Sequence, residues 1–427
     1  MPKKSLSSGN SHQIKFIVLG LIIIGAFFRF YQLDSRMQFN WDQIRDAWVM
    51  KDIIDDNKFP LLGPVAKGTS GFYIGPSYYY LLSPFYIFTN LDPIASGIFV
   101  GVVSIVTLII LYEVVKRTFS IWVAIISLAF YAFSIHAIGF DRIPWSVAFL
   151  PLLSIGIFYF LLRLLQGDKQ ALVGLALIIG FTFHIHFTAI YFVVIVLLCL
   201  PFIRWSRKMI GLTLVSLLFF FLWFLPHIIS SFITHDSSGS NLIKYVQTYY
   251  HGLHITRVLQ LLQDGFIEFE SLFYFRELKM LKFIILPLFS FFYIQRNGWV
   301  KSKNIIYVVW IWFLVPLLIM SVYSGEISNY YFATTRTIAV ITTSYVIVAL
   351  FQNKHKIIQI VIIFLCVVFI GKNIEQFFRV PTNGGLNNVR SQVKDAVSQG
   401  VIIPFAEGDS KSYFYYLYGE RAKLKSK

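Results

Sequence analysis

The sequence predicts an all-helical protein that crosses a membrane many times. Of its 427 residues, 57% are hydrophobic and only 14% are charged, which is too little charge to cover a soluble protein of this size. Apolar runs of about twenty residues, enough to cross a bilayer core of about 30 Å, recur along the whole chain. Basic residues gather in the short connections between these runs, which is the pattern of cytoplasmic loops in membrane proteins.

The net charge of +16 also raises the alternative of nucleic-acid binding. The basic residues do not form one patch or one helical face, however. They are spread over loops such as Lys3-Lys4, Lys116-Arg117, Arg204–Lys208 and Lys354–Lys356. We therefore assign the charge to membrane topology and expect no nucleic-acid partner.

The positive-inside rule places the N-terminus in the cytoplasm, the C-terminus outside and about eleven spans between them. The first apolar run is long and no small-residue cleavage site follows it, so we expect an anchor rather than a removed signal peptide. The expected spans are residues 13–31, 94–114, 119–139, 145–165, 170–185, 187–203, 208–228, 280–295, 304–323, 333–351 and 357–372.

The segment Ser77–Phe88 is apolar and rich in tyrosine, but it is short for a span. If it crossed the membrane, Lys116-Arg117 and every later basic loop would lie outside. We therefore expect a juxtamembrane or re-entrant helix within the first external loop. A tilted span is the alternative.

The spans divide the chain into a transmembrane domain, residues 1–372, with a first external loop at 32–93, and a short external tail, residues 373–427. Within the tail, Leu386–Ser398 has the pattern of an amphipathic helix and Val401–Ile403 that of a short strand, which predicts a small α/β unit. A segment of about 55 residues is a marginal independent domain, so we expect it to pack on the external loops.

An acidic pair follows the first span directly. Asp42 and Asp46 are four residues apart, so on a helix they share one face just outside the membrane. The flanking Trp41 and Trp48 favour the membrane interface. A general base acting on a lipid-carried substrate is needed at this depth. The alternative for Asp42 is a solvated carboxylate at a helix end.

The rest of the first external loop carries Lys67 in a glycine-rich turn, and Tyr78 and Tyr79 in the helix that follows. We interpret the tyrosines as the wall of a groove for an isoprenoid chain. An aromatic belt at the membrane interface is the alternative.

Later spans bring further polar groups to their external ends. Asp141 and Arg142 form a tight turn, for which an exposed ion pair is the alternative. Arg336 lies slightly inside a span, and because an intramembrane charge is costly it is a functional candidate; a snorkelling side chain is the alternative. We expect Asp42, Asp141 and Arg336 to converge on one external cavity. His186, Tyr330 and Tyr331, at neighbouring span ends, are expected in the donor or acceptor groove.

The sequence gives little support for a bound cofactor. It contains no P-loop, dinucleotide fingerprint or nucleophile elbow. His251 and His254 have a spacing suited to zinc, but no further ligand is in register, so a divalent metal stays an open alternative. Cys199 and Cys366 fall inside spans and predict neither a disulfide nor a metal site.

Several of these segments resemble the GT-C superfamily of glycosyltransferases, especially its protein O-mannosyltransferase and aminoarabinose-transferase branch. The resemblance covers about residues 13–350. It rests on Asp42 after the first span and on the segments Gly75–Leu82, Phe140–Trp145, Gly180–Ala189 and Asn329–Phe332. It implies a GT-C-like helix bundle with external juxtamembrane helices.

The resemblance also implies roles for individual residues. Asp42 matches the catalytic aspartate, and Asp141 the second acidic position. The usual glutamate after the aspartate is Gln43 here, and Gly75 replaces a usual basic residue. The donor phosphate must then be bound by other cations, for which Lys67, Arg142 and Arg336 are the candidates, and Asp46 is expected in the substrate groove.

The implied reaction transfers a sugar from a polyprenyl-phosphate donor to an acceptor hydroxyl on a protein, lipid or glycan, with inversion. The expected location is a bacterial inner membrane. A lipid-linked sugar transporter or flippase is one alternative, but transporters show repeated halves and midplane charges, whereas these charges gather at one face. A polysaccharide polymerase or ligase is the other, and such enzymes favour external arginines and histidines over a first-loop aspartate.

Overall fold

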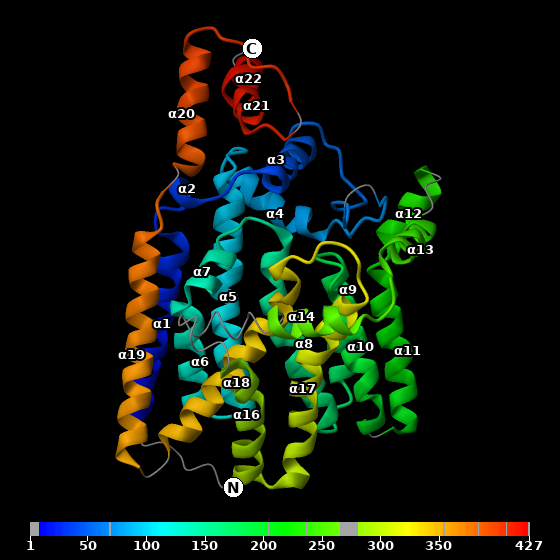
Figure 1. Ribbon diagram of the computed structural model, residues 1–427. Helices are drawn as coiled ribbons and strands as arrows, with labels where there is room; N and C mark the ends of the chain where they lie inside the picture. Colours follow the sequence, from blue (N-terminus) through cyan, green and yellow to red (C-terminus); the bar gives the residue numbers. More distant parts are fainter. Residues whose placement is uncertain are drawn as a thin grey trace.

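The computed structural model of the chain is a bundle of long helices with a cap of short helices at one end (Figure 1). It describes residues 8–67, 70–203, 205–234, 238–264, 281–352, 355–382, 384–406 and 408–425. The bundle consists of α1 (Ser8–Phe30), α5 (Ile94–Thr118), α6 (Ile121–Phe133), α7 (Ile135–Asp141), α8 (Leu150–Leu165), α9 (Ala171–Phe183), α10 (Ala189–Cys199), α11 (Arg207–Leu222), α12 (Leu225–Thr234), α16 (Leu281–Asn297), α17 (Trp299–Ser321), α18 (Ala333–Phe351) and α19 (Lys356–Arg379).

Each span expected from the sequence falls on helices of this bundle. Among the described residues, six helices are long and apolar enough to cross a membrane, or eight segments if the bent pairs α6–α7 and α11–α12 each count once. α9 and α10 are apolar but shorter. The all-helical polytopic class is therefore confirmed, and the larger number of spans stays a prediction.

The break between α6 and α7 has a local cause. The pair bends by 66° at Ser134, whose side chain accepts a hydrogen bond from the Ala137 backbone N–H and so begins α7 as a new helix. The Asn373 side chain on α19 accepts a second bond, from the Ile135 N–H at 2.7 Å. The bend carries Asp141, at the end of α7, into the bundle interior.

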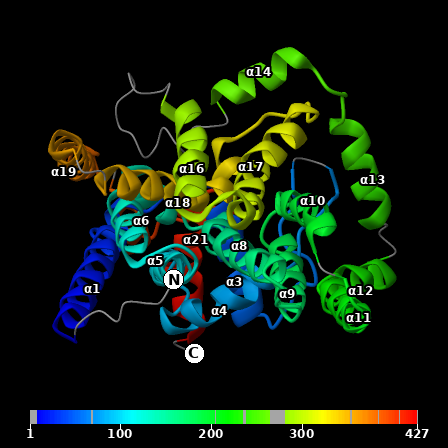
Figure 2. The ribbon, with the colours of Figure 1, turned by 90° about the horizontal axis from the view of Figure 1, so that it is seen from below.

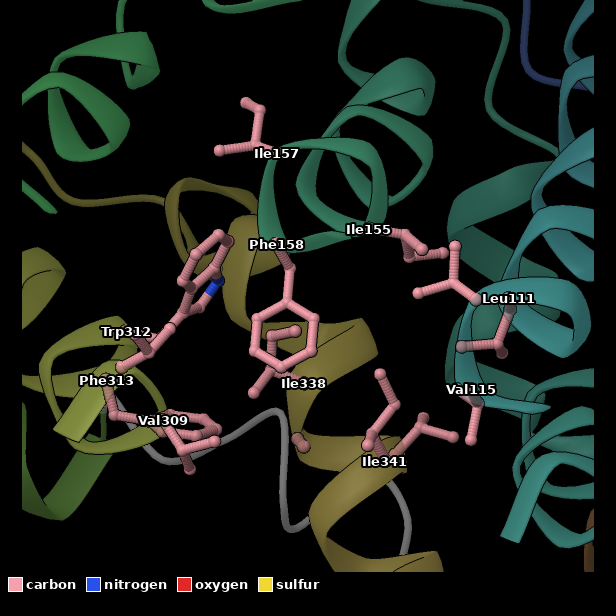
Figure 3. Packing of buried hydrophobic residues seen from close by; sticks show 14 of the residues in the cluster. Leu111, Val115, Ile155, Ile157, Phe158, Val309, Trp312, Phe313, Ile338 and Ile341 are labelled. Carbon is pink, nitrogen blue, oxygen red and sulfur yellow. The ribbon is translucent and has the colours of Figure 1, made fainter. Parts of the chain in front are cut away.

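The core of the bundle is packed around α8, α17 and α18. The rings of Phe158 and Trp312 meet edge to face with centroids 5.5 Å apart, and Ile338 lies beside them (Figure 3). The indole N–H of Trp312 donates to the Thr334 carbonyl at 2.9 Å, which satisfies a buried donor. This bond fixes the first turn of α18, where Arg336 also lies.

The cap covers the end of the bundle opposite the N-terminus, which we call the outer end (Figure 1). It contains α2 (Leu33–Arg36), α3 (Trp41–Ile54), α4 (Ser77–Phe88), α20 (Gly385–Ser398), α21 (Ser410–Tyr415) and α22 (Arg421–Lys425). The bounds of α4 are those expected for the juxtamembrane helix. Two further helices, α13 (Ser238–Tyr249) and α14 (Ile255–Asp264), lie at the rim of the bundle seen end-on (Figure 2).

The tail packs through ion pairs on residues 32–93, the segment that the sequence predicts to be the first external loop. Arg421 pairs with Asp55 at 2.7 Å, and Arg390 pairs with Asp92 at 2.9 Å. The expected helix of the tail is α20, but the strand predicted at Val401–Ile403 is not formed. The described residues contain isolated bridges and no strand that could accept its backbone hydrogen bonds, so the segment runs as an irregular connection.

Candidate active site

Asp42 lies in the first turn of α3, at the outer end. The helix begins with a capping box, in which the Gln43 side chain accepts a hydrogen bond from the Asn40 backbone N–H at 3.0 Å. Gln43, which stands where the resemblance predicts a glutamate, therefore has a structural role: its neutral side-chain amide caps the start of α3. Asp42 is then the single carboxylate in the first turn of the helix. The Asp42 side chain is 52% exposed, so a substrate can reach it.

Arg45 joins the two acidic residues of α3. Its guanidinium donates to Asp42 at 2.8 Å and to Asp46 at 2.7 Å. Burial raises the pKa of Asp46 to about 6, against the opposing effects of Arg45 and of a hydrogen bond from Tyr79. At neutral pH Asp46 is therefore ionised and holds Arg45 beside Asp42. The sequence signal for Arg45 is its position three residues after Asp42.

Tyr78 and Tyr79 do not form the open groove wall expected from the sequence. Both side chains are buried, and the Tyr78 ring lies 5.9 Å from that of Phe99 on α5. The tyrosines instead pack α4 against α3 and α5. They contribute to the site indirectly, by supporting the helix that carries Asp42.

Asp42 lines a small pocket of about 110 Å³. We call it the Asp42 pocket; it is lined by Asp42, Arg45, Pro64, Val65, Ala66, Ile74, Trp145, Ser146, Val147, Ile185, His186, Phe187 and Tyr330. Most of the lining residues lie in or close to the segments on which the sequence resemblance rests, whereas Pro64, Val65 and Ala66 come from an earlier part of the loop before α4. Because small-molecule sites usually exceed about 300 Å³, this pocket would enclose only the reacting end of a substrate.

His186 presents a neutral ring to the Asp42 pocket. Its Nδ1 accepts a hydrogen bond from the Thr188 backbone N–H at 3.3 Å, which leaves the ring proton on Nε2. Burial lowers the pKa of His186 to about 3, so the ring does not become charged near neutral pH. The rings of Tyr330 and Tyr331 lie 5.6 and 5.5 Å from it and fix its orientation. His186 is suited to donate a hydrogen bond rather than to exchange a proton.

Lys67 is the predicted phosphate-binding cation that lies next to the Asp42 pocket, immediately after the lining residue Ala66. Its ammonium group donates to the Glu326 carbonyl at 2.8 Å and lies over the rings of Tyr249 and Tyr323, 5.8 and 5.3 Å from their centroids. The side chain therefore joins the loop between α3 and α4 to the chain before α18.

Asp141 lies in a separate, buried cluster. Its carboxylate pairs with Arg29 of α1 at 2.8 Å, with 0% and 2% of the two side chains exposed. The hydroxyls of Ser104 and Tyr131 donate to it at 2.5 and 3.1 Å. Asp141 does not line the Asp42 pocket, so the expected convergence of the two aspartates is not seen. A charge in the last turn of the first span was the signal for Arg29.

Arg142 and Arg336 do not line the Asp42 pocket either. Arg142 donates to the carbonyls of Phe28 and Tyr31 at 2.7 and 2.9 Å, so it caps the end of α1. The guanidinium of Arg336 is buried 4.2 Å above the ring of Phe140. These contacts give Arg142 a structural role, which the sequence did not indicate.

No group of three or more His, Cys, Asp or Glu side chains with metal-binding geometry occurs in the part of the chain that the structure describes. The carboxylates of Asp42 and Asp46 are bridged by the guanidinium of Arg45.

The glycine at position 75 has a steric cause. A Cβ atom there would lie 2.2 Å from Cγ of His184, whose Nδ1 is 2.7 Å from the Ser77 hydroxyl at the start of α4. A basic side chain therefore does not fit at this position unless the histidine moves.

We expect Gly75→Ala to lower the free energy of unfolding by about 1–3 kcal/mol, because overpacking forces His184 off α4. A shift of the thermal unfolding midpoint in detergent measures it. Gly20→Ala, where nothing lies within 4 Å of the added methyl, is the matched control and should leave the midpoint unchanged or raise it. Equal midpoints for the two variants would contradict the steric argument.

Two comparisons bear on the fold and its family. Residues 75–229 match the dolichyl-phosphate-mannose-protein mannosyltransferase family. The whole chain is similar to ArnT from Cupriavidus metallidurans in its apo state, with a TM-score of 0.61 and 10% identity over 95% of this chain and 85% of ArnT. The chain has the GT-C fold. The fold that the sequence resemblance implies is thereby confirmed.

Other GT-C structures are similar to a comparable degree. ArnT bound to undecaprenyl phosphate gives a TM-score of 0.55 at 10% identity, over 96% of this chain and 75% of that one. The oligosaccharyltransferase of Archaeoglobus fulgidus gives 0.57 at 10% identity, over 95% of this chain, which spans 62% of the archaeal protein. No curated protein sequence matches the chain.

Proposed function

We propose that the protein is an integral membrane glycosyltransferase that takes its sugar from a polyprenyl-phosphate donor. The observation that carries the proposal is the accessible carboxylate of Asp42 in a pocket at the outer end of a GT-C bundle. The similarity to ArnT with undecaprenyl phosphate bound, and to the Archaeoglobus fulgidus oligosaccharyltransferase AglB with a dolichol-phosphate and an inhibitory peptide, supports a lipid-linked donor. The similarity to the same oligosaccharyltransferase tethered with an acceptor peptide supports a separate acceptor.

In the proposed reaction, the acceptor hydroxyl attacks the anomeric carbon of the donor sugar. Asp42 accepts the hydroxyl proton, the new glycosidic bond forms, and the bond from the anomeric carbon to the phosphate oxygen breaks. The polyprenyl phosphate leaves with its electron pair, and a single displacement inverts the anomeric centre. Arg45 orients the base through the 2.8 Å contact with Asp42, while the neutral His186 N–H binds a sugar or phosphate oxygen.

The leaving phosphate needs positive charge close to the Asp42 pocket. Arg45 lines this pocket, and Lys67 directly follows the lining residue Ala66 and acts electrostatically on the lining residue Tyr330. Arg142 and Arg336 neither line the pocket nor adjoin a lining residue. We therefore propose Lys67 and Arg45 as the groups that bind the donor phosphate, because charge on the leaving group increases as its bond to the sugar breaks. The proposed site faces the outside of an inner membrane, with the N-terminus in the cytoplasm.

We expect Lys67→Met to raise the KM for the donor about tenfold, the effect of losing one hydrogen bond to a charged group, with a smaller effect on kcat. Steady-state release of polyprenyl phosphate measures both constants. Lys58→Met, an exposed lysine of the same loop paired with Asp56, is the control and should change neither constant. An unchanged KM in Lys67→Met would remove this residue from the phosphate site.

The proposal as a whole is tested by incubating the purified full chain with a panel of polyprenyl-phosphate sugars and acceptor peptides, lipids and glycans. Release of polyprenyl phosphate that depends on the acceptor supports a transferase. Movement of labelled donor across the membrane of proteoliposomes, without cleavage of the donor, would instead support the transporter alternative.

A further inference from the structure

A second, larger cavity lies at the outer end, and the proposed reaction does not use it. It has a volume of about 560 Å³. We call it the Arg36 cavity; its lining comes from α2, the chain between α2 and α3, α7 and the turn after it, the end of α19, and the tail. Asn40 and Ile143 line it, whereas Asp42 and Trp145, two residues farther along each segment, line the Asp42 pocket. The same two segments therefore separate the two cavities.

The Arg36 cavity is positively charged. The side chains of Arg36 and Arg142 line it, and no acidic residue does. Both guanidinium groups donate to backbone carbonyls, Arg36 to Phe377 at 2.9 Å and Arg142 to Phe28 at 2.7 Å. A carbonyl oxygen satisfies an N–H group but does not neutralise its charge. Two neighbouring cations without a neutralising side chain in the lining favour the binding of an anion.

Part of the lining of this cavity is apolar. Ile135 and Ile138 of α7 and Phe377 of α19 contribute to it, beside the polar residues Ser35 and Asn388. The cavity lies at the outer ends of α1 and α19, which are the two least buried of the long apolar helices. Phe28 and Phe377 join these helices with ring centroids 4.9 Å apart. A ligand with a charged head and a hydrocarbon chain would match both kinds of lining.

We propose that the Arg36 cavity binds the phosphate headgroup of an anionic lipid, whose chain leaves along the exposed faces of α1 and α19. The planar fork of an arginine side chain suits two phosphate oxygens, and 560 Å³ lies within the range of small-molecule sites. The site is distinct from the Asp42 pocket and requires no chemical step. An occupied site would fix the chain that leads from α2 into α3.

Native mass spectrometry of the full chain in detergent tests the proposal, with dioleoylphosphatidylglycerol, undecaprenyl phosphate, inorganic phosphate and a neutral diacylglycerol as separate probes. We expect lipid binding to weaken about tenfold in Arg36→Gln, as for a lost hydrogen bond to a charged group. Gly139→Leu should abolish it, because Gly139 lines the cavity and nothing lies within 4 Å of a Cβ placed there, so the new side chain fills the cavity.

Arg379→Gln is the matched control. This arginine lies at the same end of α19, pairs with Glu375 and does not line the cavity, so its loss should leave binding unchanged. The two phosphate lipids distinguish a membrane phospholipid from the donor's own carrier. Inorganic phosphate or the neutral lipid binding as tightly as the phosphate lipids would overturn the proposal, as would equal binding to all variants. Since the readout is binding, an Asp42→Asn protein without turnover should still bind normally.

Discussion

Asp42→Asn is expected to lower turnover by about 10²–10⁴-fold while leaving donor binding nearly unchanged, which is the range for loss of a positioned general base. Asparagine keeps the size of the side chain and an oxygen for the 2.8 Å contact with Arg45, but it cannot accept the acceptor's proton. Asp46 continues to hold Arg45, so the geometry of the pocket should persist. Release of polyprenyl phosphate measures turnover, and co-purified or titrated donor lipid measures binding.

Asp52→Asn is the control for this experiment. Asp52 lies on the same helix, is 44% exposed and pairs with Lys51 at 3.3 Å, but it does not line the Asp42 pocket. Its replacement should leave turnover within about twofold of the parent, as is usual for an exposed ion pair. An Asp42→Asn protein that turns over as fast as Asp52→Asn would show that another group takes the proton.

Asp141→Ala is expected to have the largest effect on stability, about 3–5 kcal/mol, because it leaves the fully buried Arg29 without its counter-charge. The two hydroxyls that donate to Asp141 lose their acceptor in the same change. The free energy of unfolding in detergent, or the thermal midpoint, measures the loss. The double variant Arg29→Leu/Asp141→Leu should recover much of it, since both charges are then absent.

The exposed pair of Arg163 with Asp168 provides the comparison. The N–O distance is 2.7 Å in this pair and 2.8 Å in the buried pair of Arg29 with Asp141. The Arg163 and Asp168 side chains, however, are 47% and 32% exposed. Asp168→Ala should therefore cost no more than about 1 kcal/mol. Equal losses in Asp141→Ala and Asp168→Ala would mean that Arg29 finds other compensation when its partner is removed.

The sequence predicted the bundle well because membrane helices are specified locally. Length, hydropathy and basic loops are read over about twenty residues at a time, and each expected span falls on a helix. The bounds of α4 followed from the same reasoning. The prediction of a strand at Val401–Ile403 was wrong, because a β-strand needs a partner strand elsewhere in the chain and three apolar residues do not show whether one exists.

The candidate site was predicted less completely, since side chains at span ends face different sides of the bundle. Asp42, His186 and Tyr330 do line one pocket, and their roles in it stay predictions. Asp141 and Arg336 lie at similar depth in the sequence map, yet the 66° bend before α7 turns Asp141 toward α1. A map of spans gives depth but not the direction in which each helix presents its residues.

The contact between the tail and α3 has a consequence for how the protein is made. The helix that carries Asp42 is synthesised long before the tail. Asp55, which directly follows that helix, receives its partner Arg421 only some 366 positions later. The neighbouring Tyr416 hydroxyl bonds the same carboxylate at 2.6 Å. The surroundings of the Asp42 helix are thus completed by a segment that is synthesised much later, so a nascent chain that ends before Arg421 would hold its spans in the membrane without the tail contacts at the end of that helix.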